Sequence, residues 1–317
     1  MTTTGNMNRT GAFDDAEKLG KVLQDERAAD TVTMSSVDDA KAIVETFRSS
    51  NAMTPWTNVD RSAYADRLDF ILADPRTIMQ GSLNVCGPAA FFNIMIGRHP
   101  VAVAQCATAL YDTGRGDIGD LHIEANRNLL STDYSVTVAA IQKKSGVVTP
   151  PAEYILLGAL RNATVAFWQP DWTGNPDQEL AGMTRPEELA AWFHATGFFA
   201  TVVDGGKWAT NPGIPNATNL SCASGRDNAL LINANLLASI GLTGVDNTYI
   251  RSSFPNHWIV LRTEIIVDTT MAADGISMLD TGIWTWGSSF LGLRYPQQEF
   301  LDNYYGAVTT LLPPQGN

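Results

Sequence analysis

Cys86 stands where a cysteine thiol is able to act as a nucleophile. It follows the loop Gln80-Gly-Ser-Leu-Asn-Val and precedes Gly87-Pro88-Ala-Ala, which predicts the start of a helix over residues 88–96. The N-terminal end of a helix favours a thiolate, and Gly87 leaves room for a substrate. The chemistry this indicates is attack on a carbonyl carbon. Such attack also needs a base, a group that orients the base, and donors for the oxyanion.

The base must be one of four histidines. His99 precedes a proline, His122 lies in a loop-rich stretch, and His194 is near a predicted helix end, where an imidazole contacts the last carbonyls. His257 instead begins the apolar run HWIVL, the start of a predicted strand over residues 257–267. A histidine at the mouth of a buried strand is held rigidly while its ring faces a cleft, so we expect His257 to be the base.

Asp280 is the candidate for orienting this histidine. It ends a second predicted strand, residues 276–280. We expect this strand to form an antiparallel hairpin with residues 257–267 and to return the chain beside His257. Asp280 would then accept a hydrogen bond from one ring nitrogen of His257.

The spacing of these residues resembles that of papain-like cysteine peptidases. Gln80 precedes Cys86 by six residues, and the order Cys86, His257, Asp280 matches the family's order of nucleophile, base and orienting residue. The run HWIVL…ISMLDTGIWTWG is similar to the bacterial branch, which includes peptidases that process bacteriocin leaders and cysteine effectors delivered by bacteria. The resemblance covers roughly residues 77–312. It implies a papain-like α+β fold in which the Gln80 amide and the Cys86 N–H hold the oxyanion.

The sequence departs from the family at both motifs. Papain-type chains usually carry Ser or Gly-Ser before the cysteine and a tryptophan after the following residue, whereas this chain has Asn-Val-Cys86-Gly-Pro. Their third residue is commonly Asn followed by Ser-Trp, whereas this chain has Asp280-Thr-Gly. These changes point away from lysosomal-type endopeptidases.

We therefore expect a thiol-dependent hydrolase that acts on a peptide, isopeptide or side-chain amide bond of a protein or peptide substrate. Water would release the acyl-enzyme, and no metal or organic cofactor is required. A transglutaminase or a deamidase would use the same residues. The resemblance to delivered effectors leads us to expect a bacterial toxin with a neutralising partner protein.

A rival interpretation from another class remains open. It is a catalytically inactive papain-like fold that serves as a binding or structural module. In that case Cys86 is a small core residue, Gln80 bonds its own loop and Asp280 is a turn acid. Trp258 and Trp284 are candidate cleft walls, although either would also pack in a core.

Helices dominate the predicted first half of the chain and strands the second, which is typical of an α+β fold with helices packed on an antiparallel sheet. We divide the chain into an N-terminal helical extension, residues 1–75, and a catalytic domain, residues 76–317. Helices are predicted over residues 14–27, 36–47, 60–72, 88–96, 101–111, 151–161, 184–197 and 297–305; strands over 198–203, 229–237, 257–267, 276–280 and 307–312; a loop over 113–128; and a linker over 169–182.

The composition of the chain indicates which classes of partner are not expected. The 317 residues carry a formal net charge of −12, so nucleic acid is not expected as a partner, because phosphate binding needs a basic surface. No run is long and apolar enough for a membrane span, and no signal-peptide pattern is present, so we expect no integral membrane association and either a cytoplasmic location or export without a cleaved signal. The three cysteines show no C-x-x-C spacing, and a Cys106–Cys222 bridge stays open.

Overall fold

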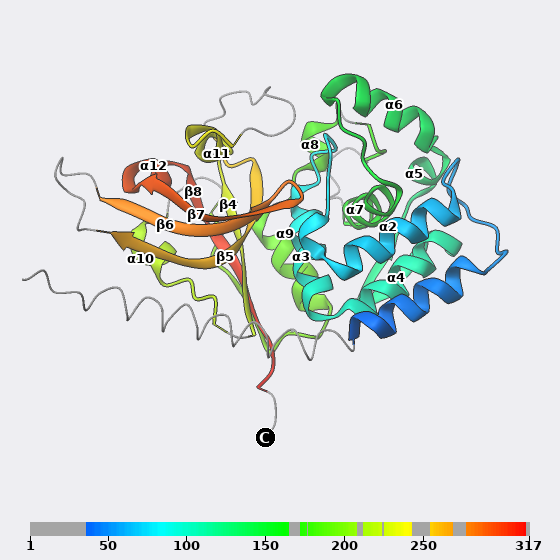
Figure 1. The fold of residues 1–317 in the computed structure, drawn as a ribbon, viewed down its shortest axis with the longest axis horizontal. Helices are drawn as coiled ribbons and strands as arrows, with labels where there is room; N and C mark the ends of the chain where they lie inside the picture. The colour runs from blue at the N-terminus through cyan, green and yellow to red at the C-terminus, as the bar shows by residue number, and fades with distance from the viewer. Residues whose placement is uncertain are drawn as a thin grey trace, which may run out of the picture.

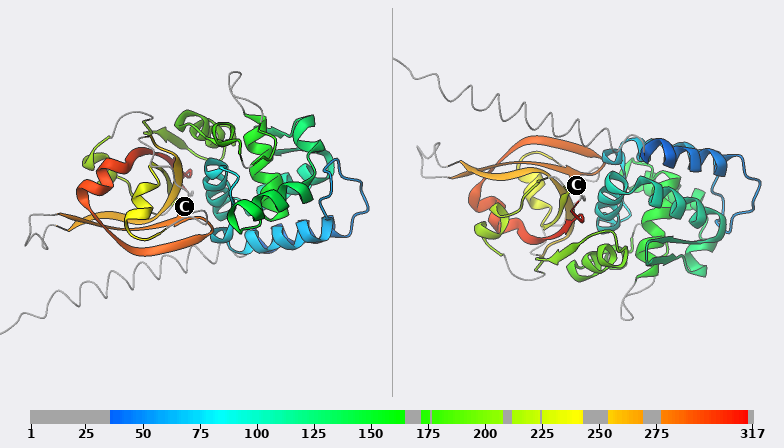
Figure 2. Two further views of the ribbon diagram at one scale, coloured as in Figure 1. Left: turned by 90° about the horizontal axis from the view of Figure 1, so that it is seen from above. Right: turned by 90° about the horizontal axis from the view of Figure 1, so that it is seen from below.

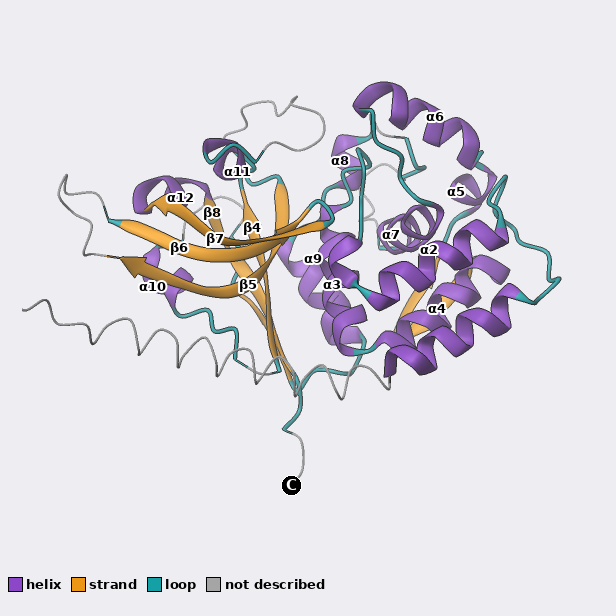
Figure 3. Ribbon diagram, in the orientation of Figure 1, coloured by secondary structure: helices purple, strands orange, loops and turns teal. Residues whose placement is uncertain are grey.

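The computed structural model describes residues 36–164, 172–175, 177–207, 212–223, 225–242, 254–268 and 277–314. The predicted helix over residues 14–27 lies outside this part of the chain, as do residues 169–171 and 176 of the predicted linker over 169–182. Within it the fold is α+β, with the helices gathered on one side and an antiparallel sheet on the other (Figures 1 and 3).

The helical side is built from segments that precede the sheet in sequence. A helix covers residues 36–48. It is followed by α2 (Arg61–Ala73), η1 (Pro75–Thr77), α3 (Cys86–Arg98), α4 (Pro100–Thr113), α5 (Arg127–Ser131), α6 (Tyr134–Ser145), α7 (Pro151–Ala163), α8 (Glu179–Gly182) and α9 (Pro186–Ala195). Several begin where the sequence predicts: the Asp60 side chain caps α2, and Pro151 opens α7.

The sheet has six strands in the order β3-β8-β4-β5-β6-β7, and every neighbouring pair is antiparallel. The strands are β3 (Thr201–Asp204), β4 (Arg226–Ile232), β5 (His257–Asp268), β6 (Met278–Thr285), β7 (Ser288–Pro296) and β8 (Tyr304–Leu311). Three short helices, α10 (Ile214–Thr218), α11 (Asn235–Ser239) and α12 (Gln297–Asn303), lie on the sheet side of the molecule (Figure 1).

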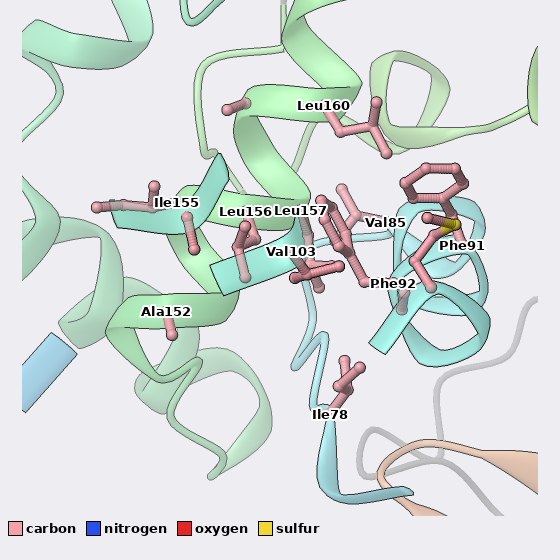
Figure 4. Close-up of a cluster of buried hydrophobic side chains, with 14 of the residues drawn as sticks. Ile78, Val85, Phe91, Phe92, Val103, Ala152, Ile155, Leu156, Leu157 and Leu160 are labelled. Carbon is pink, nitrogen blue, oxygen red and sulfur yellow. The ribbon is translucent and has the colours of Figure 1, made fainter. Parts of the chain in front are cut away.

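Helix α3 lies between the helical side and the sheet, as the two further views also show (Figure 2). Every residue from Cys86 to Ile96 is buried, which is the pattern of a helix surrounded by core. Side chains of α3, α4 and α7, among them Phe91, Val103 and Leu157, point toward one another in one cluster (Figure 4). The central helix thus fixes Cys86, its first residue, against the sheet.

The two faces of the sheet belong to different clusters. Trp258 and Val260 of β5 pack in the cluster that contains α3, whereas Ile259 and Leu261 pack in a second cluster that includes α11 and α12 residues. This alternation follows from the two-residue period of a strand. Strand β5 therefore contributes side chains to both cores.

Two predicted segments differ from the structure. Residues 113–128, predicted as a loop, contain the hairpin β1 (Arg115–Ile118) and β2 (Leu121–Glu124) and the start of α5. Each strand is only four residues long, and its alternating burial is too short a pattern to stand out among glycines and acids. The predicted strand over 229–237 ends at Ile232 and is followed by α11, because Leu236 and Leu237 pack as one buried turn of helix.

Residues 36–75 share a core with the rest of the described chain. Phe47 and Tyr64 lie in the cluster that contains α3 and α7, and the Tyr64 hydroxyl donates to Ala107 O at 2.8 Å. Arg67 donates to the buried Glu153 carboxylate on α7. Each helix in the described part of the chain is too short or too polar to cross a lipid bilayer.

Candidate active site

Cys86 is the first residue of α3, which begins two residues before the predicted start at Pro88. Val85 precedes the helix without a side-chain cap, and the Cys86 side chain is 7% exposed. The thiol donates to Asn256 O at a distance of 4.0 Å, and the backbone N–H groups of Trp258 and Gly87 bond its sulfur. These contacts join the start of α3 to the start of β5.

His257 begins β5 and is buried, with 3% of its surface exposed. Its Nε2 atom lies 2.7 Å from Thr285 Oγ1, and its ring stacks on Trp286 with a centroid distance of 5.0 Å. In the described part of the chain, the thiol of Cys86 bonds backbone atoms on either side of His257 rather than the imidazole ring.

The prediction that Asp280 lies beside His257 is wrong. Asp280 pairs with Ile266, nine residues along β5 from His257, which corresponds to about 30 Å at 3.3 Å per residue. Its carboxylate faces Arg294 on β7, with Oδ1 3.6 Å from Nη1. The predicted hairpin does form, but β6 continues past Asp280 to Thr285, and the later residues return beside His257.

Thr285 and Trp286 therefore occupy the place that the sequence assigned to Asp280. Thr285 is fully buried and supplies the oxygen that contacts His257. The sequence signal for them was the length of the apolar run after Asp280, GIWTW, which extends the strand beyond residue 280. A threonine hydroxyl is less conspicuous than a carboxylate, and for this reason the sequence did not single it out.

Gln80 lies where the family resemblance implies, in the loop before α3. Its side chain is 9% exposed, and its buried Oε1 atom has no hydrogen-bond partner among the described residues. Its backbone carbonyl accepts from Leu83 N at 3.3 Å and from Thr149 Oγ1 at 3.4 Å, so the backbone closes the loop and the amide is left for other contacts. A buried amide oxygen without a partner is uncommon in a folded protein.

One small cavity brings these residues together. It is lined by Ile78, Gln80, Cys86, Ala89, His257, Trp258, Trp284 and Trp286. Its volume of about 10 Å³ is roughly the space of one water molecule. The cavity therefore collects the predicted nucleophile, base, oxyanion donor and both predicted wall tryptophans, while Asp280 lies outside it.

The two tryptophans also anchor the surroundings of the cavity. Trp258 Nε1 donates to Thr184 O at 2.8 Å, and Trp284 Nε1 donates to Arg76 O at 2.7 Å. Both rings are buried in the cluster that contains α3. Both tryptophans therefore line the cavity and also pack in the hydrophobic core.

Burial determines the protonation states of Cys86 and His257. It raises the pKa of the Cys86 thiol to about 11, against the opposing effect of backbone N–H groups and the Arg161 charge. It lowers the pKa of His257 to about 3. At neutral pH the closed site therefore holds a neutral thiol and a neutral imidazole.

The remaining cysteines and histidines lie elsewhere. Cys106 is buried on α4, Cys222 is partly exposed, and both are free thiols. His99 stacks on Phe198, and His122 is exposed beside Asp117. These groups are not part of the cavity.

Comparisons with known proteins found no match. No protein-family model matches it, and neither a curated protein nor a solved structure does so. The site must therefore be interpreted from its own geometry.

Proposed function

We propose that this chain is a cysteine-dependent acyl-transfer enzyme of papain-like type. The observation that carries the proposal is the convergence of Gln80, Cys86 and His257 in one cavity, although they come from segments far apart in the sequence. Thiol catalysis of acyl transfer requires a cysteine nucleophile, a base and a donor for the oxyanion, and the helix-start Cys86, His257 and the side-chain amide of Gln80 are of those types.

The chemistry follows from the contacts. With Nε2–H donating to Thr285, the Nδ1 atom of His257 is the basic nitrogen of the neutral ring. It takes the proton of the Cys86 thiol, and the sulfur attacks the carbonyl carbon of an amide in a protein or peptide. The Cys86 N–H and the Gln80 NH₂ group, presented by rotation of the amide, hold the oxyanion. His257 protonates the leaving amine, and water hydrolyses the thioester.

The cavity must open for this to occur, because about 10 Å³ does not admit an amide group. Opening hydrates both side chains, which moves their pKa values toward their ordinary range and permits proton transfer. The closed form is then the resting state of the enzyme.

The surroundings of Cys86 and His257 also support a second candidate function, that of a catalytically inactive module. A neutral thiol bonded to backbone and an imidazole covered by Trp286 are also what a structural core would contain. In that case the cavity never opens, and Cys86 stays unreactive.

Alkylation of the native protein separates the two. We expect iodoacetamide at pH 8 to label Cys86 faster than Cys222, although Cys222 is the more exposed thiol. Peptide mass mapping measures each rate. His257→Ala should slow the labelling of Cys86, whereas Gln80→Ala should leave it unchanged, because alkylation builds no oxyanion.

Cys222→Ser is the matched control and should not alter the rate at Cys86. Slower labelling of Cys86 than of Cys222 in the unmodified chain, with no effect of His257→Ala, would establish the inactive module instead.

A further inference from the structure

Residues 181–185, which we call the strap, connect α8 to α9 and cross the candidate active site. Gly182 packs against the loop before Cys86 so closely that a Cβ atom there would lie 2.6 Å from Asn84 O. Thr184 covers Gly87, where a Cβ atom would lie 2.3 Å from Thr184 Cβ. The strap therefore touches the chain on both sides of Cys86.

The strap also contacts the strand that carries His257. Its Thr184 carbonyl accepts from Trp258 Nε1 at 2.8 Å, and Trp258 directly follows His257. One residue of the strap thus contacts the neighbour of the proposed nucleophile and the neighbour of the proposed base.

Arg161, in the last turn of α7, holds the strap in place. Its side chain is fully buried, and its Nε donates to Ala181 O at 2.6 Å. Its Nη1 lies 3.4 Å from Glu188 Oε2, and the same carboxylate oxygen accepts from Arg185 N at 2.8 Å. The two ends of the strap are therefore bonded to the two members of one buried ion pair.

The guanidinium also acts on the thiol through its charge. The positive charge of Arg161 works against burial and favours the thiolate of Cys86, and Cys86 in turn favours the charged form of Arg161. Such a cation inside an acidic protein is costly to bury, and the ion pair with Glu188 offsets that cost only in part.

We propose that Arg161 is a positioning residue for the thiol chemistry: through the strap it sets Cys86 against His257, and its charge stabilises the thiolate when the proton moves to His257. The inference rests on the proposed function.

The test compares Arg161→Met, which keeps bulk but removes the charge, with Arg161→Lys, which keeps a cation. Below the thiol pKa the alkylation rate follows the thiolate fraction, so the rate of Cys86 labelling by iodoacetamide at pH 8.5 reports a change in that pKa. We expect Arg161→Met to lower the rate severalfold, because loss of the positive charge removes one of the effects that oppose burial and favour the thiolate. Arg161→Lys should restore most of the rate.

Arg98→Met is the matched control. Arg98 ends the same helix that Cys86 begins, and it also pairs with a carboxylate, Asp227. It should leave the Cys86 rate unchanged. The labelling of Cys222 in each sample serves as the internal reference.

Circular dichroism and urea unfolding check that each variant is folded. If Arg161→Met does not fold, the test is repeated with the double variant Arg161→Met/Glu188→Leu. In this variant the carboxylate that Arg161 neutralised is removed together with the arginine, so no unpaired charge is left buried. A folded variant without the charge that keeps the original rate overturns the inference, as does an equal loss in Arg98→Met.

Failure here is distinct from failure of the proposed function. If His257→Ala leaves the Cys86 rate unchanged while Arg161→Met lowers it, the enzyme proposal fails and the effect of Arg161 on the thiol stands. If instead His257→Ala lowers the Cys86 rate and Arg161→Met does not, the inference about Arg161 fails and the enzyme proposal stands.

Discussion

At the scale of single residues, the contact between His257 and Thr285 determines how the imidazole is held. A neutral hydroxyl 2.7 Å from Nε2 holds the orientation of the ring without adding a negative charge. The pKa of His257 is accordingly governed by burial, which lowers it to about 3, and none of the carboxylates in the described part of the chain opposes this shift. An aspartate in this place would have raised it.

We expect Thr285→Val to disturb His257 and Asp280→Asn to have little effect. Valine keeps the shape of threonine but leaves the buried Nε2 atom without its hydrogen-bond partner, at a cost of about 1–3 kcal/mol. Urea unfolding measures this loss, and the labelling rate of Cys86 should fall with it.

Thr285→Ser is the conservative control: it keeps the hydroxyl and should retain the labelling rate, while the lost buried methyl group costs about 0.8 kcal/mol of stability. The half-exposed Asp280 should change the free energy of unfolding by no more than about 0.5 kcal/mol when it becomes asparagine. A larger effect at Asp280 than at Thr285 would contradict this assignment.

At the scale of elements, the turn between β6 and β7 closes the cavity. Thr285 pairs with Ser288, and the two residues between them have positive φ angles, 47° at Trp286 and 76° at Gly287. This is the pattern of a two-residue type I′ turn, in which asparagine and glycine are favoured and a bulky side chain is strained. The strained residue is Trp286, whose ring stacks on His257. The strain lowers the local stability of the turn, and the same conformation places the Trp286 ring over the imidazole.

Trp286→Asn should relieve the strain and expose His257 to water. In the unmodified protein the pKa of His257 is depressed to about 3, so its contribution to stability is complete above about pH 6.5 and is lost as the pH falls toward 3. The loss approaches about 1.4 kcal/mol per pH unit below pH 6.5 and totals about 2 kcal/mol between pH 7 and pH 5. With water at the ring, the variant should lose much less over the same interval.

Urea unfolding at pH 7 and pH 5 measures this difference. His257→Gln is the reference for each protein, because groups common to both cancel, and the exposed His194→Gln is the control. If Trp286→Asn and the unmodified chain lose the same free energy of unfolding, Trp286 does not exclude water from the imidazole.

At the scale of the whole molecule, the segment before residue 76 and the helices after it form one core. Phe47 and Tyr64 are buried against Tyr111 of α4, and Trp56 Nε1 donates to Leu110 O at 2.7 Å. The backbone of residues 76–80 then leads from this core to Gln80, with Met79 N bonded to the buried Glu153 carboxylate at 3.1 Å. The helical side thus supports the loop of the candidate site.

A chain that begins at residue 76 should not fold. It lacks Phe47, Trp56 and Tyr64, and burial of each such ring contributes about 2–3 kcal/mol, which together approaches the whole stability of a typical domain. Circular dichroism and urea titration should show no cooperative transition. A cooperative transition like that of the full chain would instead establish residues 76–317 as an independent domain.

The sequence by itself determined features that depend on neighbouring residues. The start of a helix at Cys86 follows from Gly87-Pro88 and the apolar run after it, and the α+β class follows from the order of helical and strand periodicities. The predicted hairpin of β5 and β6 also formed, because its two strands are close in the chain.

Tertiary structure alone decided which residues meet at the cavity. The pairing of β5 with β6 shifts at irregularities between Leu261 and Ile266, and the strand runs on to Thr285, so the register places Thr285 at His257 and leaves Asp280 at the far end. Arg161 reaches the site through a strap that begins twenty residues later in the chain. No local pattern encodes such contacts, because each depends on how separate helices and strands pack around one buried helix.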